Sequence, residues 1–121
     1  MEGYSDLKIY ERSYRAAKAI YLNIASKFPD EEKYGLKSQI QKASTSIPLN
    51  IAEGYGKGGG EKEMLRFMYM ARGSSHEVQV LLDFAKDFGY ISEREHEKAT
   101  KEYEEIGRML TGFIQSKEQR V

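Results

Sequence analysis

Five polar residues combine side-chain types and spacing that could support chemistry. Ser46, Asn50 and Glu53 recur three to four residues apart beside an apolar stripe, and Arg72 and Glu77 lie in a second periodic stretch. Residues at that spacing share one face of a helix, so an antiparallel neighbour could place Glu53 beside Arg72 in a semi-buried pair. Removing one partner of a buried pair typically costs about 3–5 kcal/mol. We interpret the group as a polar network that fixes the register between two helices, and catalysis by the pair is the alternative.

Three shorter motifs resemble catalytic or binding signatures in an unsuitable context. Residues 54–59 match G-x-G-x-x-G, but a predicted helix precedes them. A dinucleotide site requires a strand there, so we predict a turn with positive φ angles. Phosphate contact by the next helix N-terminus is the minor alternative.

Residues 93–96 contain Glu-x-x-His once, whereas a di-iron bundle needs two such motifs. Residues 74–76 read Ser-Ser-His, and consecutive helix residues point in different directions. The sequence therefore predicts no catalytic residue, metal, cofactor or small-molecule substrate.

Composition narrows the class of protein. The chain has 121 residues, with 19 Lys and Arg against 19 Asp and Glu, and no cysteine. Disulfides and thiolate sites are therefore excluded. The apolar runs are far shorter than the roughly 18 residues of a membrane helix, and the N-terminus lacks a signal-peptide core. We expect one cytoplasmic domain spanning residues 1–121, with no membrane partner.

Apolar residues recur at helical spacing in four stretches, which predict helices over about 5–27, 36–53, 61–88 and 93–117. Ser5 can cap the first helix, and Phe28-Pro29 should end it. Gly89 is placed for a left-handed C-cap, and Ser92 with Glu95 forms a capping-box pattern. These helices predict an all-α protein, an antiparallel up-down four-helix bundle with left-handed packing.

Pro48 lies inside the second predicted helix. Proline removes one backbone hydrogen bond there, so it should kink the helix. Two short helices are the alternative. The apolar stripe continues in phase across Pro48, which favours one kinked helix.

Two stretches carry apolar residues nearly all the way round the helix. They are residues 16–25 and 64–71, whose only clearly polar side chains are Lys18, Asn23 and Arg66. Deep burial in one bundle would explain them, but we predict a second buried face against another subunit. Because the patches lie on different helices, the contact would be head-to-tail and could close into a ring. The predicted interface comprises Ala16, Ala19, Ile20, Leu22, Leu65, Met68, Tyr69 and Met70.

Basic residues are spread over the first three predicted helices, mainly the first two. The candidate nucleic-acid contacts are Lys8, Arg12, Arg15, Lys37, Lys42, Lys57 and Lys62. A nucleic-acid footprint usually shows a clear basic excess, which this chain lacks. A solvated helix face is the simpler interpretation, although a ring would repeat the stripe so that weak phosphate contacts could sum.

Residues 46–54, S-I-P-L-N-I-A-E-G, and 71–77, A-R-G-S-S-H-E, resemble the four-helix-bundle proteins encoded in intervening sequences of bacterial 23S rRNA genes. The resemblance runs from about Leu7 to Ile114. It implies an up-down bundle that forms a ring-like homo-oligomer, commonly a pentamer, without an established catalytic activity. The family also includes accessory proteins of diversity-generating retroelements, which bind nucleic acid and a reverse transcriptase.

Two functional hypotheses follow from the residues and the resemblance together. The first is a non-enzymatic, ring-forming interaction scaffold whose expected partners are its own copies, with RNA or another protein as further candidates. The second is a nucleic-acid-binding accessory factor to a reverse transcriptase in a diversity-generating retroelement.

Overall fold

Each of the four periodic stretches forms a helix in the computed structural model, which describes residues 3–4, 7–56 and 59–119. The helices are α1 (Lys8–Ala19), α2 (Leu36–Gly56), α3 (Gly60–Asp87) and α4 (Glu93–Glu118). The described residues contain no strand. The prediction of an all-α four-helix bundle is therefore confirmed.

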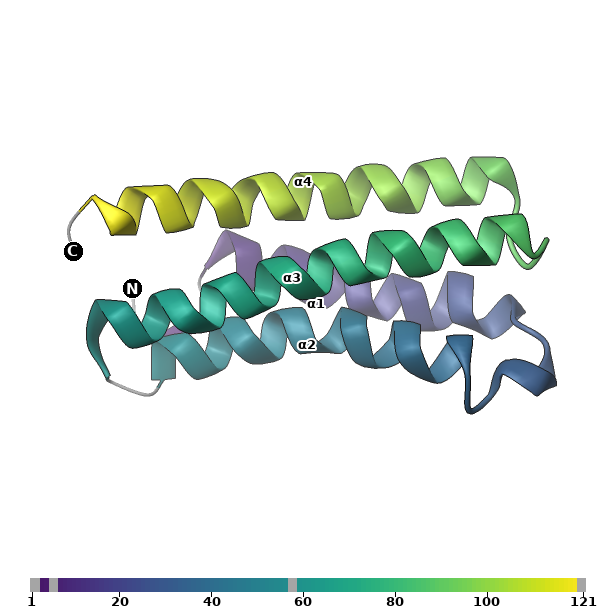
Figure 1. The fold of residues 1–121 in the computed structure, drawn as a ribbon, viewed down its shortest axis with the longest axis horizontal. Coiled ribbons are helices and arrows are strands. Elements are labelled where there is room, and N and C mark those ends of the chain that lie inside the picture. The colour runs from purple at the N-terminus through teal and green to yellow at the C-terminus, as the bar shows by residue number, and fades with distance from the viewer. Residues whose placement is uncertain (1–2, 5–6, 57–58, 120–121) are drawn as a thin grey trace.

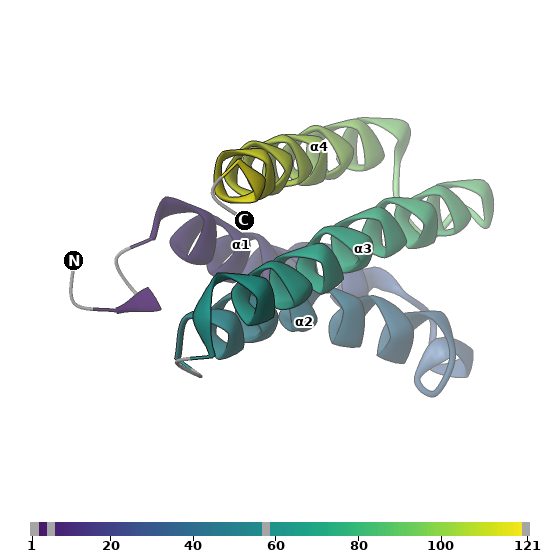
Figure 2. The ribbon, with the colours of Figure 1, turned by 60° about the vertical axis from the view of Figure 1, so that its left-hand side comes forward.

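The four helices lie side by side and successive helices run in opposite directions (Figure 1). α1 packs on α2 and α4, and α3 packs on the same two helices, so the bundle is a closed cycle of neighbours. The turned view in Figure 2 shows α4 lying across from α2, with α1 and α3 between them. Left-handed packing stays a prediction.

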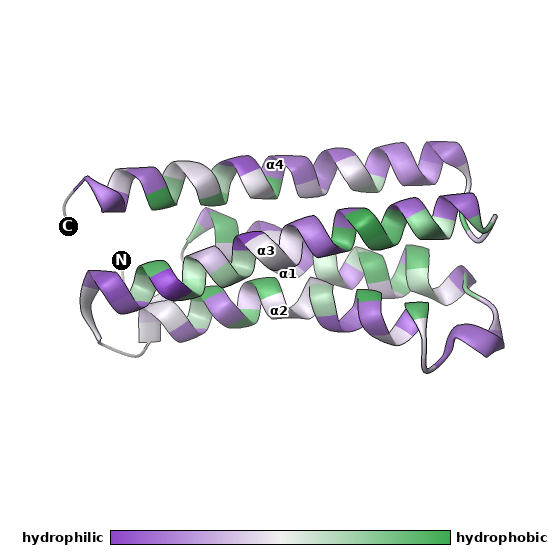
Figure 3. Ribbon diagram, in the orientation of Figure 1, coloured by the Kyte–Doolittle hydropathy of each residue, from purple (hydrophilic) through white to green (hydrophobic). Residues whose placement is uncertain are grey.

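One apolar core runs along the bundle axis. Its fully buried side chains come from every helix of the bundle, with Tyr103 as the largest; they include Ile20, Ile40, Ile47, Ile51, Val78, Leu82, Ile106 and Leu110. Figure 3 shows α4 as a largely hydrophilic ribbon. That helix buries only a narrow stripe, which is the pattern of a helix packed on one side.

The first predicted helix is not uniformly α-helical. α1 begins at Lys8, after Leu7, and the predicted Ser5 cap lies outside the described residues. A π-helical segment, η2 (Ile20–Ile24), and a 3₁₀ turn, η3 (Ala25–Lys27), continue it. Phe28 then adopts an extended conformation before proline, which ends the helical region at the predicted place.

α2 passes through Pro48 as one helix, so the alternative of two short helices is wrong. Pro48 is buried, like the residues of the apolar stripe on either side of it, so α2 stays packed against the core across the proline. The kink stays a prediction. α2 also extends to Gly56, beyond the expected end at residue 53, because Gly54 packs inside the helix rather than starting a turn.

The turns between helices follow local chemistry. Gly89 has a φ of +79° and donates its backbone N–H to the Lys86 carbonyl at 3.0 Å, while the N–H of Tyr90 reaches the Ala85 carbonyl at 2.9 Å. This pair of bonds is a Schellman motif, as expected of a glycine C-cap. Among the described residues of the glycine-rich 54–60 stretch, Gly60 is the one whose φ angle is positive.

Ser92 and Glu95 form the predicted capping box. The Ser92 hydroxyl accepts the Glu95 backbone N–H at 3.0 Å, and the Glu95 carboxylate accepts the Ser92 backbone N–H at 2.8 Å. Two otherwise unpaired backbone donors are thereby satisfied at the start of α4.

Candidate interaction surfaces

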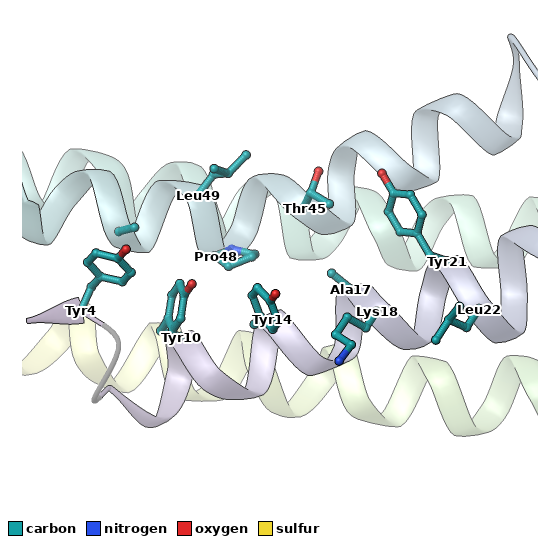
Figure 4. Close-up of a pocket in the computed structure, with 11 residues that line it drawn as sticks. Tyr4, Tyr10, Tyr14, Ala17, Lys18, Tyr21, Leu22, Thr45, Pro48 and Leu49 are labelled. Atoms are coloured by element: carbon teal, nitrogen blue, oxygen red, sulfur yellow. The ribbon is translucent and has the colours of Figure 1, made fainter.

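An aromatic groove lies between α1 and α2. We call it the tyrosine groove; it has a volume of about 520 Å³ and is lined by Tyr4, Tyr10, Tyr14, Ala17, Lys18, Tyr21, Leu22, Thr45, Pro48, Leu49 and Ala52. Figure 4 shows Tyr10 and Tyr14 extending from α1 toward α2, with Pro48 facing them. Leu22 and Leu49 are 69% and 65% exposed, so large apolar side chains at this groove contact solvent.

The aromatic rings of the groove contact one another. The ring centroids of Tyr4 and Tyr10 are 4.9 Å apart, and those of Tyr10 and Tyr14 are 5.9 Å apart. Burial, followed by the neighbouring phenols of Tyr4 and Tyr14, raises the pKa of Tyr10. The groove therefore presents neutral aromatic rings with polar hydroxyl tips, a composition typical of recognition surfaces.

A second exposed apolar surface follows the outer face of α3 near its C-terminal end. We call it the α3 stripe; its residues Val80, Phe84 and Phe88 are 53%, 48% and 55% exposed. They are spaced four residues apart, so their side chains share one helix face. The Phe84 and Phe88 rings lie 5.7 Å apart between centroids, which makes the stripe continuous there.

The predicted oligomer interface divides between core and surface. Ala16, Ile20, Leu65 and Met68 are buried by the chain's own helices, so their assignment to an interface is corrected to the core. The other four lie on the surface: Ala19, Leu22, Tyr69 and Met70. Leu22 belongs to the tyrosine groove. The sequence reasoning missed the α3 stripe because each of its residues also fits an apolar helix face.

The predicted polar network is partly assembled. On α2, the Asn50 amide donates to the Ser46 carbonyl at 2.8 Å, and the Ser46 hydroxyl donates to the Ser74 hydroxyl of α3. Sequence reasoning placed Ser46 and Asn50 in this network but missed Ser74. Ser46 of α2 therefore contacts Ser74 of α3, and the role of this contact in fixing the register between the two helices stays a prediction.

Arg72 contacts a residue of α4 that the sequence analysis did not name. Its guanidinium donates to the Thr111 hydroxyl of α4 at 3.3 Å and lies 4.9 Å from the ring centroid of Tyr69. Arg72 therefore joins α3 to α4, and its predicted pairing with Glu53 stays a prediction. Glu53 and Glu77 are both exposed.

Another hydroxyl outside the prediction links α3 to α4. The buried Ser75 hydroxyl donates to the backbone carbonyl of Tyr103 at 3.1 Å. Within the Ser-Ser-His stretch, Ser74 thus accepts a hydrogen bond from α2 and Ser75 donates one to α4. Adjacent helix residues point to different neighbours, which is the geometric reason that this stretch is not a catalytic cluster.

The candidate nucleic-acid contacts do not form one patch of free cations. Arg12 makes a two-bond ion pair with Glu102 of α4, at 2.8 and 3.0 Å, and Arg15 pairs with Glu11 at 3.3 Å. Exposed lysines are distributed over three helices, at Lys8, Lys42 and Lys62, while Lys37 is half-buried. Lys57 lies outside the described residues. Nucleic-acid binding stays a prediction.

His96 serves as an inter-helix contact. Its Nε2 lies 2.7 Å from Asp83 Oδ1 of α3 and 3.4 Å from the Thr100 hydroxyl. Among residues 3–4, 7–56 and 59–119, no group of three or more His, Cys, Asp or Glu side chains could hold a metal ion. None of the helices in the same part of the chain combines the length and the apolar character needed to cross a bilayer.

Comparison with known proteins points to one family. Residues 5–112 match the family model of the 23S rRNA-intervening sequence protein. A search of curated proteins finds no match. A solved structure from Bacteroides thetaiotaomicron, described as a protein with unknown function from the S23 ribosomal protein family, is similar to this fold. It has 20% sequence identity and a TM-score of 0.78, and the similarity covers 88% of this chain and 97% of that one. Because the family model spans most of its length, the chain belongs to the 23S rRNA-intervening sequence protein family.

Proposed function

We propose that this protein is a non-enzymatic scaffold that assembles from copies of itself, head to tail. The tyrosine groove of one copy receives the α3 stripe of the next. The observation that carries the proposal is the pair of exposed apolar surfaces on different helices of the same bundle. Clusters of large exposed apolar side chains on a helical bundle mark interaction surfaces.

The charges around the two surfaces are complementary. Lys18 lines the tyrosine groove, and the exposed Lys42 lies one helical turn from Thr45 on the α2 side. The exposed residues Asp83, which also contacts His96, and Asp87 flank Phe84 and Phe88 on α3, and they outnumber the half-buried Lys86. Opposite charges around an apolar centre favour one orientation of docking and oppose stacking of like surfaces.

A heterologous contact of this kind closes into a ring when a whole number of equal rotations from one copy to the next completes one full turn. A pentamer is the subunit count that the family resemblance implies. In a ring, every copy uses both surfaces, so no groove or stripe is left in contact with water. This accounts for apolar side chains that a lone bundle leaves exposed.

The nucleic-acid-binding alternative, with a reverse transcriptase as partner, has weaker support. Two of its predicted cations are engaged in ion pairs, and the net charge of the chain is zero. Proteins that bind RNA or DNA through phosphates usually carry a clear basic patch. We therefore place self-assembly first.

The test uses two variants that each remove one surface, Leu49→Glu in the groove and Phe84→Glu in the stripe. We expect the native protein to sediment as an oligomer and each variant to sediment as a monomer. Leu49→Glu keeps its stripe and Phe84→Glu keeps its groove, so an equimolar mixture should form a dimer that grows no further. Tyr34→Glu, at a highly exposed position outside both surfaces, is the matched control and should assemble normally.

Circular dichroism would show whether all variants keep the native helix content. A native protein that remains monomeric at micromolar concentration contradicts the proposal. So does a mixture of the two variants that stays monomeric, because head-to-tail pairing requires one intact groove and one intact stripe.

A further inference from the structure

A second cavity, separate from the tyrosine groove, lies between the α1–η2 segment and α4. It has a volume of about 620 Å³, within the range of small-molecule sites. Its apolar lining residues are mainly Ala16, Ala19, Ile20, Ile24, Ala99 and Tyr103. On each helix these residues fall on one face, so the cavity follows the seam between the two elements.

The sequence explains why this seam is not filled. Three of the facing residues are alanines, at positions 16, 19 and 99, whose side chains end at Cβ. The segment η2 is π-helical, and such segments inside α-helices often occur at functional sites. Ion pairs join α1–η3 to α4 at two points along the seam, Arg12 with Glu102 and Lys27 with Glu95.

Tyr103, one of the residues that line this cavity, carries a buried polar group. Tyr103 is 1% exposed, and its hydroxyl has no hydrogen-bond partner among the described residues. Buried hydroxyl groups in native proteins are nearly always bonded, so an unpartnered one beside a cavity indicates a missing acceptor. Burial raises the pKa of Tyr103, which keeps the hydroxyl protonated and able to donate.

The charges at the cavity favour an anion. Its cationic residues are Arg15, Lys27 and Lys98, and its carboxylates are Glu95 and Glu102. Both carboxylates already bind a cation, Lys27 or Arg12. Lys98 has no ion pair within the part of the chain that the structure describes. An acidic group would therefore meet uncompensated positive charge and an apolar wall together.

We propose that this cavity binds a small amphipathic carboxylate. Its apolar chain lies against Ile20, Ile24 and the alanines, and its carboxylate is held by Lys98 while accepting a hydrogen bond from the Tyr103 hydroxyl. Because that hydroxyl oxygen is covered, the ligand must displace a neighbouring side chain to reach it. The proposal does not depend on self-assembly, since none of the α3 stripe residues lines the cavity.

The test titrates the full-length protein with decanoate, below its micelle-forming concentration, by isothermal titration calorimetry. We expect saturable binding of decanoate, and much weaker binding of decanol and of decyltrimethylammonium. Each of Lys98→Ala and Tyr103→Phe should weaken decanoate binding by about tenfold, the usual scale for one hydrogen bond to a charged group. Lys101→Ala, an exposed α4 residue that pairs with Glu97, is the matched control and should bind as the native protein does.

Two further variants locate the site. Ala19→Phe changes an exposed residue of the cavity wall and should abolish binding by filling the space. Leu49→Ser changes the tyrosine groove and should leave binding unaltered. Absence of saturable decanoate binding overturns the proposal, as does equal affinity for the cationic probe. Binding that Leu49→Ser weakens and Ala19→Phe preserves assigns the ligand to the groove and also overturns it.

Thermal unfolding separates a ligand role for Tyr103 from a structural one. Removing an unpartnered buried hydroxyl leaves the ligand-free protein as stable or more stable, so Tyr103→Phe should keep or raise Tm. Loss of decanoate affinity with an unchanged or higher Tm supports the proposal. A markedly lower Tm in the ligand-free variant shows that the hydroxyl already has a structural partner, and this contradicts the proposal.

Discussion

At the scale of single residues, Glu32 shows how one side chain joins separate segments. Its Oε1 accepts the backbone N–H of Leu36 at 2.8 Å, at the start of α2, and its Oε2 accepts the Tyr90 hydroxyl at 2.8 Å. Gly35 allows this approach, because a Cβ at that position would lie 2.7 Å from Glu32 Oε1. The carboxylate thus connects the α1–α2 loop to the turn between α3 and α4.

These bonds give Glu32 a pH-dependent role. The hydrogen bond from Leu36, and then that from Tyr90, lower the pKa of Glu32 below its ordinary value of 4.5. A carboxyl group whose pKa is lower in the folded state stabilises the fold above its unfolded-state pKa. That contribution is lost as the pH falls through the folded-state pKa.

We predict that Glu32→Gln lowers Tm at neutral pH and that its difference from the native protein shrinks as the pH falls below 4.5. Differential scanning calorimetry over a pH series measures this difference. Glu104→Gln, at an exposed carboxylate of α4, is the control and should follow the native curve. A Glu32→Gln difference that is constant with pH would show that the carboxylate charge has no part in the cap.

At the scale of elements, α2 and α3 approach each other closely at Gly54. A Cβ there would lie 3.0 Å from Phe67 Cβ and 3.4 Å from the Met64 carbonyl oxygen. Both neighbours belong to α3 and neither is the free end of a flexible side chain. The residue is therefore glycine because α2 and α3 pack closely, and not because a turn begins there.

We predict opposite effects for alanine at two helical glycines. Gly54→Ala gains about 1 kcal/mol in helix propensity but meets overpacking of about 1–3 kcal/mol, so the free energy of unfolding should fall. Gly112→Ala should raise it by about 0.5–1 kcal/mol, because no described heavy atom lies within 4 Å of the added Cβ. Urea unfolding of both variants measures the change in the free energy of unfolding and its sign for each. A Gly54→Ala variant that is more stable than the native protein would contradict the prediction, because it would show that α2 and α3 can move apart without loss of stability.

At the scale of the whole molecule, the charge distribution predicts weak nucleic-acid binding. Positive and negative charges balance, and the guanidinium of Arg12 is held by Glu102. Affinity that comes from phosphate contacts falls steeply with salt, because each contact releases counterions. A bundle of zero net charge, whose exposed lysines are distributed over several helices, should therefore bind RNA weakly and only at low salt.

We predict no measurable binding of a structured RNA at physiological salt, using fluorescence anisotropy of a labelled hairpin. At low salt, Lys42→Ala and the control Lys101→Ala should weaken any residual binding equally, since neither lysine belongs to a dedicated site. Tight binding at physiological salt that Lys42→Ala selectively weakens would revive the nucleic-acid hypothesis.

Local sequence patterns determined the helices of this protein. Apolar spacing of three and four residues predicted the four helices, and the Gly89 cap and the Ser92–Glu95 capping box needed only neighbouring residues. These features depend on short-range geometry that any chain with the same local residues reproduces. The π-helical segment η2 was not predicted, because its apolar residues suit an α-helix equally well.

Only the tertiary structure decided which apolar residues are covered and which polar groups meet. Residues 16 and 20 are buried while 22 is exposed, although all three lie in one apolar run. Arg72 reaches α4, and the alanines at 16, 19 and 99 leave a cavity beside Tyr103. Side-chain periodicity states which face of a helix is apolar, whereas burial and pairing depend on the rotation and distance of neighbouring helices, which long-range packing sets.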